Sequence, residues 1–171
     1  MRTADVIADW LAEKGIATAY GIVGGGNHVL FDAIAKKGGC QIVCCHHEQA
    51  AAMASTYHNR IVGGIGSVVL LTTGAGSTNA ITGIMAAWMD SIPLLVLSGN
   101  EASKYMGAPT RVWGVQGYPS AELVDRCTKM IARFVSGDVR MVLEGAYGTA
   151  TTPREGPVWL DFPKDTQAKE A

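Results

Sequence analysis

Short apolar runs recur along the chain and are separated by longer amphipathic stretches. Two of the runs, 66–71 and 93–97, are apolar almost throughout, which is typical of strands buried on both faces of a parallel sheet. Further strands are predicted at 18–22, 41–45, 129–135 and 157–162. Helical periodicity lies between them, at 3–14, 28–37, 49–61, 77–90 and 138–150.

This regular alternation of strand and helix predicts an α/β fold. We expect a single doubly wound domain with a mainly parallel sheet of about six strands over residues 1–165. Residues 166–171 are expected to form a flexible C-terminal tail. The stretch 99–119 has little periodicity, and an irregular segment of that length in a compact domain is usually functional.

The composition narrows the possible partners. Hydrophobic residues make up 48% of the chain, charged residues only 17%, and the net charge is −1. So few charges predict that part of the surface is buried against other chains. The absence of a basic run argues against nucleic-acid and anionic-membrane partners. Neither a signal-like start nor a transmembrane-length run is present, so a cytoplasmic location is expected.

Metal and disulfide chemistry have little support in the sequence. The four cysteines, Cys40, Cys44, Cys45 and Cys127, do not form CxxC pairs, so buried free thiols are predicted. His46 and His47 are adjacent in an extended segment and point to opposite faces. No compatible ligand cluster follows them, and no metal ligand is assigned to this chain.

Glu48 is the most informative residue, since it stands where an apolar strand turns into an alanine-rich helix with almost no other charge nearby. An acid in the first helical turn gains about 0.3–1 kcal/mol from the helix dipole. The same position also suits a catalytic carboxylate held in an apolar pocket. Position alone leaves both interpretations open.

Three more segments follow predicted strands: the glycine loop 24–26, the turn 73–76 and the loop that holds Gln116. Ligands bind at the carboxyl ends of the strands in open parallel sheets, so these segments and Glu48 predict a site. A dinucleotide fingerprint is not present, because Val29 breaks the G-x-G-x-x-G spacing. The glycines therefore either permit tight turns or let the backbone approach a ligand.

Several segments carry a family resemblance. They are His47-Glu48-Gln49-Ala50-Ala51, the run from Leu71 to Ile84, Met89-Asp90-Ser91-Ile92-Pro93-Leu94, Gly156-Pro157-Val158 and Asp161-Phe162-Pro163-Lys164-Asp165. In this order and spacing they resemble the N-terminal pyrimidine-binding (Pyr) domain of the thiamine diphosphate enzymes of the acetolactate synthase group. The resemblance covers essentially the whole chain.

The resemblance implies a catalytic role for Glu48. In this family the matching glutamate hydrogen-bonds to N1′ of the aminopyrimidine and favours the tautomer whose N4′ takes the proton from C2 of the thiazolium. A 2-oxo acid is then decarboxylated, and the acyl-anion equivalent passes to an acceptor. The residues implied to bind the cofactor are Glu48, Val23, Thr73, Gly74 and Asn79. Those implied to border the substrate are Gly24, Gly25, His28 and Gln116.

Departures from the family pattern leave the substrate open. Val23 stands where proline is usual, Ala75 replaces the proline of Gly-Pro-Gly, and His46 stands where arginine is usual. His28 replaces a frequently apolar residue, and the loop around Arg111 is unlike the acetolactate synthase pattern.

The family's second α/β domain has no counterpart here. That domain holds the diphosphate and Mg²⁺ through a Gly-Asp-Gly motif followed by Asn, whereas Gly137-Asp138 is followed by Val139. The resemblance therefore implies a split enzyme in which a separate diphosphate-binding (PP) subunit supplies this motif. An α2β2 assembly is expected, with Mg²⁺ on the partner.

Three alternatives remain. One is a two-subunit decarboxylase of the sulfopyruvate or phosphonopyruvate type, in which Arg111 or another loop cation would read an anionic substrate tail. Another is a non-catalytic regulatory paralogue that binds a full-length enzyme; the retention of Glu48 argues against it. The last is a piece of a longer enzyme, which the start at Met1 disfavours.

Overall fold

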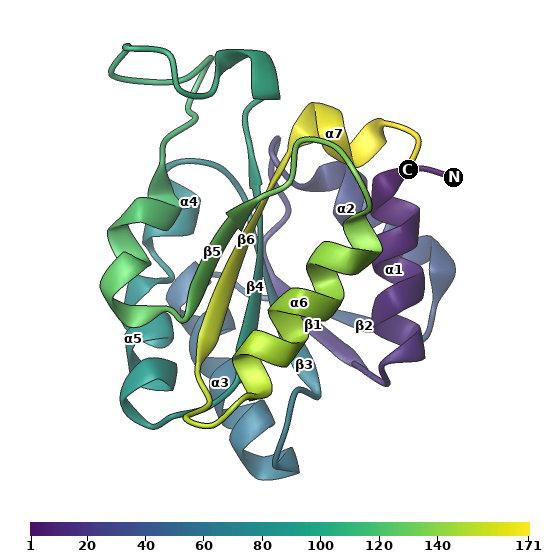
Figure 1. Cartoon of the computed structure of the whole chain (residues 1–171), viewed down its shortest axis with the longest axis vertical. Helices are drawn as coiled ribbons and strands as arrows, with labels where there is room; N and C mark the ends of the chain where they lie inside the picture. The colour runs from purple at the N-terminus through teal and green to yellow at the C-terminus, as the bar shows by residue number, and fades with distance from the viewer.

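Six parallel strands form one sheet, in the order β2-β1-β3-β4-β6-β5, in the computed structural model, which describes residues 1–171 (Figure 1). The strands are β1 Thr18–Gly21, β2 Gln41–Cys44, β3 Ser67–Leu71, β4 Leu94–Asn100, β5 Met130–Arg133 and β6 Pro157–Pro163. All six predicted strands are present, and the prediction of a doubly wound α/β fold is confirmed.

Helices cover both faces of the sheet. They are α1 Thr3–Glu13, α2 His28–Lys37, α3 Glu48–Val62, α4 Ala75–Thr78, α5 Ile81–Met89, α6 Val139–Thr151 and α7 Lys164–Ala168, with short 3-10 turns η1 Ser103–Tyr105 and η2 Ser120–Cys127. None of the helices has both the length and the hydropathy needed to cross a bilayer. Figure 1 shows α1 and α6 in front of the sheet and α3 behind it.

The central strands β3 and β4 are buried at every position because successive side chains enter two different cores. Val68 and Leu70 of β3 pack with α1, α2 and α6, in the larger hydrophobic cluster. Val69 and Leu71 of the same strand pack with α3, α5 and η2, in the smaller one. Both faces of the sheet are therefore packed against helices. The loops that follow the carboxyl ends of the strands begin at well-packed residues.

The helix predicted over 77–90 differs from the observed structure. The chain turns into α4 already at Ala75, and a turn at Asn79 and Ala80 separates α4 from α5. Ser77 lies inside α4, and its hydroxyl is hydrogen-bonded with the Gly74 carbonyl at 2.8 Å and with Ser120 Oγ at 2.7 Å. The break places Asn79 outside both helices, where its side chain can reach another element.

The prediction of a flexible tail from residue 166 is wrong for its first residues. Thr166 and Gln167 are buried in or beside α7. Gln167 Nε2 donates to the carbonyls of Gly26 at 2.6 Å and Phe162 at 2.7 Å, and its Oε1 accepts from Leu30 N–H at 3.2 Å. The prediction failed because Gln167 forms hydrogen bonds with backbone groups of distant elements. Local composition carries no signal for such bonds.

Candidate active site

The four strands β2, β1, β3 and β4 are neighbours in the sheet, so the loops that follow them meet at its carboxyl edge. Two observations show that the loops after β1 and β3 lie against each other. Gly26 N–H donates to Thr72 Oγ1 at 3.2 Å, and a Cβ at Gly26 would lie 2.6 Å from Thr73 Cγ2. The prediction that these segments share one edge is confirmed, while their role in binding stays a prediction.

Glu48 is the first residue of α3, and its side chain is nearly buried. Its neighbour His47 caps the helix, as Nδ1 accepts from Gln49 N–H at 3.2 Å. Glu48 is 8% exposed, and its Oε2 accepts from Asn79 Nδ2 at 3.0 Å. No lysine, arginine or histidine pairs with this carboxylate, and Oε1 accepts no hydrogen bond. One oxygen is therefore held by Asn79, and the other has no protein partner.

Gly76 forms the wall beside the free oxygen. A Cβ at Gly76 would lie 3.0 Å from Glu48 Oε1 and 2.7 Å from Thr72 Cγ2. Any larger residue would displace the carboxylate or the threonine, so the site depends on glycine there. Glu48 Oε1 is a hydrogen-bond acceptor that no cation occupies, and Gly76 beside it has no side chain. This arrangement fits a nitrogen atom of a planar ring as the partner of Oε1. The residues present thus suit the aminopyrimidine that the family resemblance implies.

Thr73, Gly74 and Gln116 also come together. Gln116 Nε2 donates to Thr73 Oγ1 at 2.9 Å. Gly74 has a φ of +59°, a conformation that favours glycine, and a Cβ there would overlap the carbonyl oxygen of Gln116. A groove of about 420 Å³ opens beside this contact. Its lining consists of Gly74, Ala75, Thr78, Val112, Val115, Gln116, Gly117 and Tyr118.

The first glycine loop is shaped by a residue that the sequence analysis missed. Asn27 is fully buried; its Oδ1 accepts from Gly24 N–H at 2.8 Å and its Nδ2 donates to Ile22 O at 3.0 Å. Asparagine directly before a helix is a common cap, and this signal could have drawn attention to it. In the structure its side chain bonds back to the loop instead of capping α2.

Three of the implied residues, Val23, Gly25 and His28, are exposed to solvent. Val23 is 56% exposed. The ring nitrogen Nδ1 of His28 lies 3.2 Å from the Gly25 carbonyl oxygen. These residues therefore line the outer rim of the loop, and the inner part of the edge is formed by Glu48, Asn79 and the 73–76 turn.

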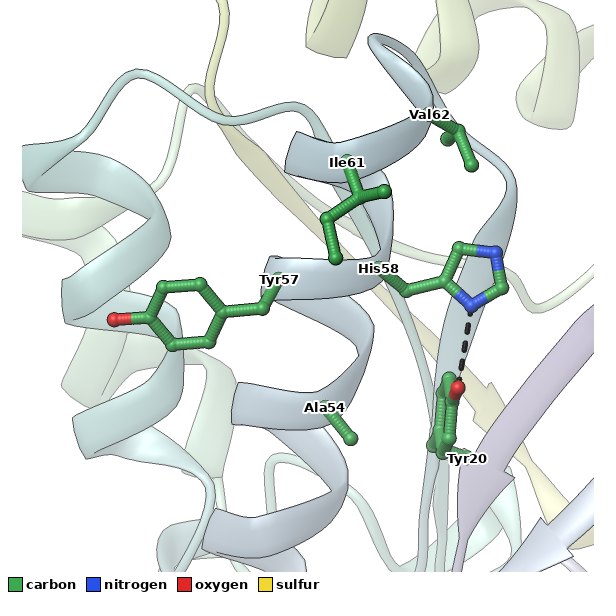
Figure 2. A pocket seen from close by; sticks show the side chains of 6 residues that line it. All are labelled: Tyr20, Ala54, Tyr57, His58, Ile61 and Val62. Atoms are coloured by element: carbon green, nitrogen blue, oxygen red, sulfur yellow. Dashed lines mark hydrogen bonds between the residues drawn. The ribbon is translucent and has the colours of Figure 1, made fainter.

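A second groove, of about 390 Å³, runs along the other end of α3 (Figure 2). Figure 2 shows His58 pointing to the Tyr20 hydroxyl, 3.2 Å away, while Tyr57 points to the opposite side of the helix. Exposed apolar side chains continue from α3 onto its neighbour α5. We call this surface the α3–α5 face, and it comprises Tyr57, Ile61, Val62, Met85, Trp88 and Met89.

No group of three or more histidine, cysteine or carboxylate side chains is placed to hold a metal ion. Asp138, which follows Gly137, caps α6 by accepting from the backbone N–H groups of Arg140 and Met141. All four cysteines are free, and the prediction that they are buried is confirmed for Cys40 and Cys127. It is wrong for Cys44, which is exposed because β2 is an edge strand.

Comparison with known proteins finds matches over most of this chain. The family model described as "Thiamine pyrophosphate enzyme, N-terminal TPP binding domain" matches residues 1–127. The isozyme 3 large subunit of acetolactate synthase from Escherichia coli (strain K12) is 36% identical over 166 residues. The acetolactate synthase large subunit of Buchnera aphidicola subsp. Schizaphis graminum is 34% identical over 170 residues. These matches cover 95% and 97% of this chain, but the chain spans only 28% of either relative.

Proposed function

Because this chain belongs to the thiamine pyrophosphate enzymes, in the family of their N-terminal TPP binding domain, we propose that it binds the aminopyrimidine of thiamine diphosphate. The proposed reaction is decarboxylation of a 2-oxo acid and transfer of the acyl-anion equivalent to an acceptor, as the resemblance to acetolactate synthases suggests. The observation that carries the proposal is Glu48, nearly buried, without a cation and with one oxygen free.

Each residue of the inner edge has a proposed task. Glu48 Oε1 would hold the ring nitrogen and share its proton, and Asn79 would orient the carboxylate through Oε2. Gly76 would leave room for the ring. Thr73, Gly74 and Gln116 would border the ring and the substrate space. The cofactor, when bound, supplies the electron sink for decarboxylation, while the protein supplies placement and polarity.

The charged end of the cofactor would be held elsewhere. We propose that residues 1–165 act as a Pyr domain beside a separate PP-domain subunit, in an α2β2 assembly, and that the partner's Gly-Asp-Gly and Asn motif binds Mg²⁺. In this chain the Asp of Gly137-Asp138 is already engaged as a helix cap, which supports the proposal. Diphosphate needs cations or clustered donors, and no metal-binding cluster is present here.

The two rival functions have less support. A decarboxylase of anionic substrates would use Arg111, but Arg111 is exposed and does not line the groove beside Gln116. The exposed side chains of that groove include Val112, Val115 and Tyr118, which suit an uncharged group. A purely regulatory paralogue would need neither the free oxygen of Glu48 nor the glycine beside it.

The direct test is reconstitution. The chain and a PP-domain subunit would be mixed with thiamine diphosphate and Mg²⁺, and carbon dioxide release from pyruvate and other 2-oxo acids would be followed. We expect release only when both chains are present. Activity from this chain alone would overturn the split arrangement. Failure of the assembled complex to release carbon dioxide from any 2-oxo acid would overturn the proposed reaction.

A further inference from the structure

Gln116 lies in a tight turn formed by residues 113–118, which we call the Gln116 turn. Trp113 N–H donates to Gly117 O at 2.9 Å, and Gly117 N–H donates to Trp113 O at 2.8 Å. The side chain of Gln116 then reaches Thr73. The turn also contacts Arg133 of β5, whose guanidinium carbon lies 5.2 Å from the centre of the Trp113 ring, and residues at the end of β4.

Glu101 is the buried carboxylate on which the two glycines of the turn pack. It follows β4 directly, and it is only 4% exposed. A Cβ at Gly114, whose φ is +59°, would lie 2.9 Å from Glu101 Oε2, and a Cβ at Gly117 would lie 2.7 Å from Glu101 Cγ. The two glycines thus let the turn rest directly on this carboxylate.

Lys164 neutralises the buried carboxylate. Its Nζ lies 2.6 Å from Glu101 Oε2, and it follows β6, whose Pro163 is in register with Asn100 of β4. Burial alone would raise the pKa of Glu101, but the hydrogen bond and charge of Lys164 outweigh it and leave the pKa below its ordinary value. The carboxyl group of Glu101 is therefore ionised at neutral pH. Removing one partner would leave an uncompensated charge, which is strongly unfavourable.

We propose that the Glu101–Lys164 ion pair is a positioning device that holds the Gln116 turn against Thr73. An effect of this ion pair on catalysis rests on the proposed function, in which Gln116 borders the substrate. The link between the ion pair and the turn rests on the contacts alone. Asn100 completes the arrangement, since its Nδ2 donates to Tyr118 O at 3.0 Å and so fixes the far end of the turn.

The first test needs only this chain. Arg111 is exposed, two residues before the turn, so trypsin cleavage after Arg111 reports how often the loop opens. We expect Glu101→Gln and Lys164→Met to accelerate this cleavage about tenfold. Lys164→Arg, which keeps the charge, should digest like the wild type.

Two controls separate the loop from the rest of the fold. Glu13→Gln removes an exposed ion pair with Arg140 and should leave cleavage after Arg111 unchanged. Cleavage after Arg60 in α3, followed in the same digest, reports global unfolding. Equal cleavage after Arg111 in the wild type, Glu101→Gln and Lys164→Met would overturn the proposal.

The second test uses the assembled enzyme. Glu101→Gln should lower kcat/KM for the 2-oxo acid about tenfold while the affinity for thiamine diphosphate stays unchanged. Adding Gln116→Ala to Glu101→Gln should cost little more than either change alone, because both act through one side chain. Fully additive losses would overturn the link to Gln116. An inactive wild-type complex would count against the proposed function, whereas the trypsin result would still decide on the positioning role.

Discussion

At the scale of single residues, the chemistry concentrates on a carboxylate that the chain leaves half-satisfied. Glu48 has one oxygen bound to Asn79 and the other beside Gly76, with no cation within salt-bridge distance. Burying a charged group without a partner of opposite charge costs free energy. Another buried carboxylate of this chain has such a partner. Glu101, equally buried, is paired with Lys164. This contrast separates the proposed catalytic glutamate from a supporting one.

Glu48→Gln should therefore abolish proton transfer without unfolding the protein. The amide keeps an oxygen that can accept from Asn79, but it cannot share a proton with a ring nitrogen. In the assembled enzyme we expect a loss of at least about a hundredfold in kcat. The exposed Glu122→Gln is the matched control and should keep wild-type activity. Full activity of Glu48→Gln would contradict the role proposed for this residue.

The cysteines give a second test at this scale. Burial raises the pKa of the Cys40 thiol to about 11, so roughly 0.1% of it is thiolate at pH 8. Cys44 is exposed. In the native protein, iodoacetamide should therefore modify Cys44 at least about a hundredfold faster than Cys40. In guanidinium chloride the two should react alike. Fragmentation of the tryptic peptide 38–60 by tandem mass spectrometry assigns the label to each cysteine, and similar native rates would mean that Cys40 is accessible.

At the scale of elements, α3 and α5 pack unusually closely because a glycine lies between them. A Cβ at Gly83 would lie 2.5 Å from Ala52 Cβ and 2.9 Å from Met53 N. The contact matters for the site, since α3 carries Glu48 and the segment just before α5 carries Asn79. Separation of these two helices would lengthen the bond between the two side chains.

Gly83→Ala should destabilise the fold by about 1–3 kcal/mol, the usual cost of overpacking a core. Gly148→Ala is the matched change, because Gly148 lies in α6 with nothing within 4 Å of an added Cβ. It should stabilise the protein by about 0.5–1 kcal/mol through helix propensity. Urea denaturation of both variants measures the two effects, and equal shifts would contradict the close packing.

At the scale of the whole molecule, two features are important: the α3–α5 face and the C-terminal segment. The face exposes large apolar side chains on the helix that begins with Glu48. A subunit that binds next to Glu48 would contact α3, the helix that begins with this residue. The C-terminal segment joins loops from different strands, as Gln167 bonds to Gly26 and Asp165 accepts from Ser103 N–H and Oγ. It therefore holds the carboxyl edge together.

The α3–α5 face leads to a prediction about assembly. Ile61 is 85% exposed on this face, and Ile61→Asp should weaken association with the PP-domain subunit at least about tenfold, or 1.4 kcal/mol. Met141 is 69% exposed on α6, on the other face of the sheet, and Met141→Asp should change the dissociation constant less than about twofold. Titration calorimetry would measure both. Normal association of Ile61→Asp would exclude the face as the interface.

Much of the fold could be predicted because its signals are local. The apolar runs of β3 and β4 and the glycine-punctuated helices revealed the parallel sheet, and the sheet brought Glu48, Thr73 and Gln116 to one edge. The roles of Glu101 and Gln167 could not be predicted, because each acts on groups that are near in space but far apart in sequence.

The sequence by itself determined the fold class, the order of the strands and helices along the chain, and the family, through motifs whose spacing is a property of the chain. Only the tertiary structure decided that Glu48 keeps a free oxygen, that Gly76 makes room beside it, and that a buried ion pair supports Gln116. The physical reason is that secondary structure follows from periodicity within a few residues. Burial, pairing and close approach depend on which distant segments the fold brings into contact.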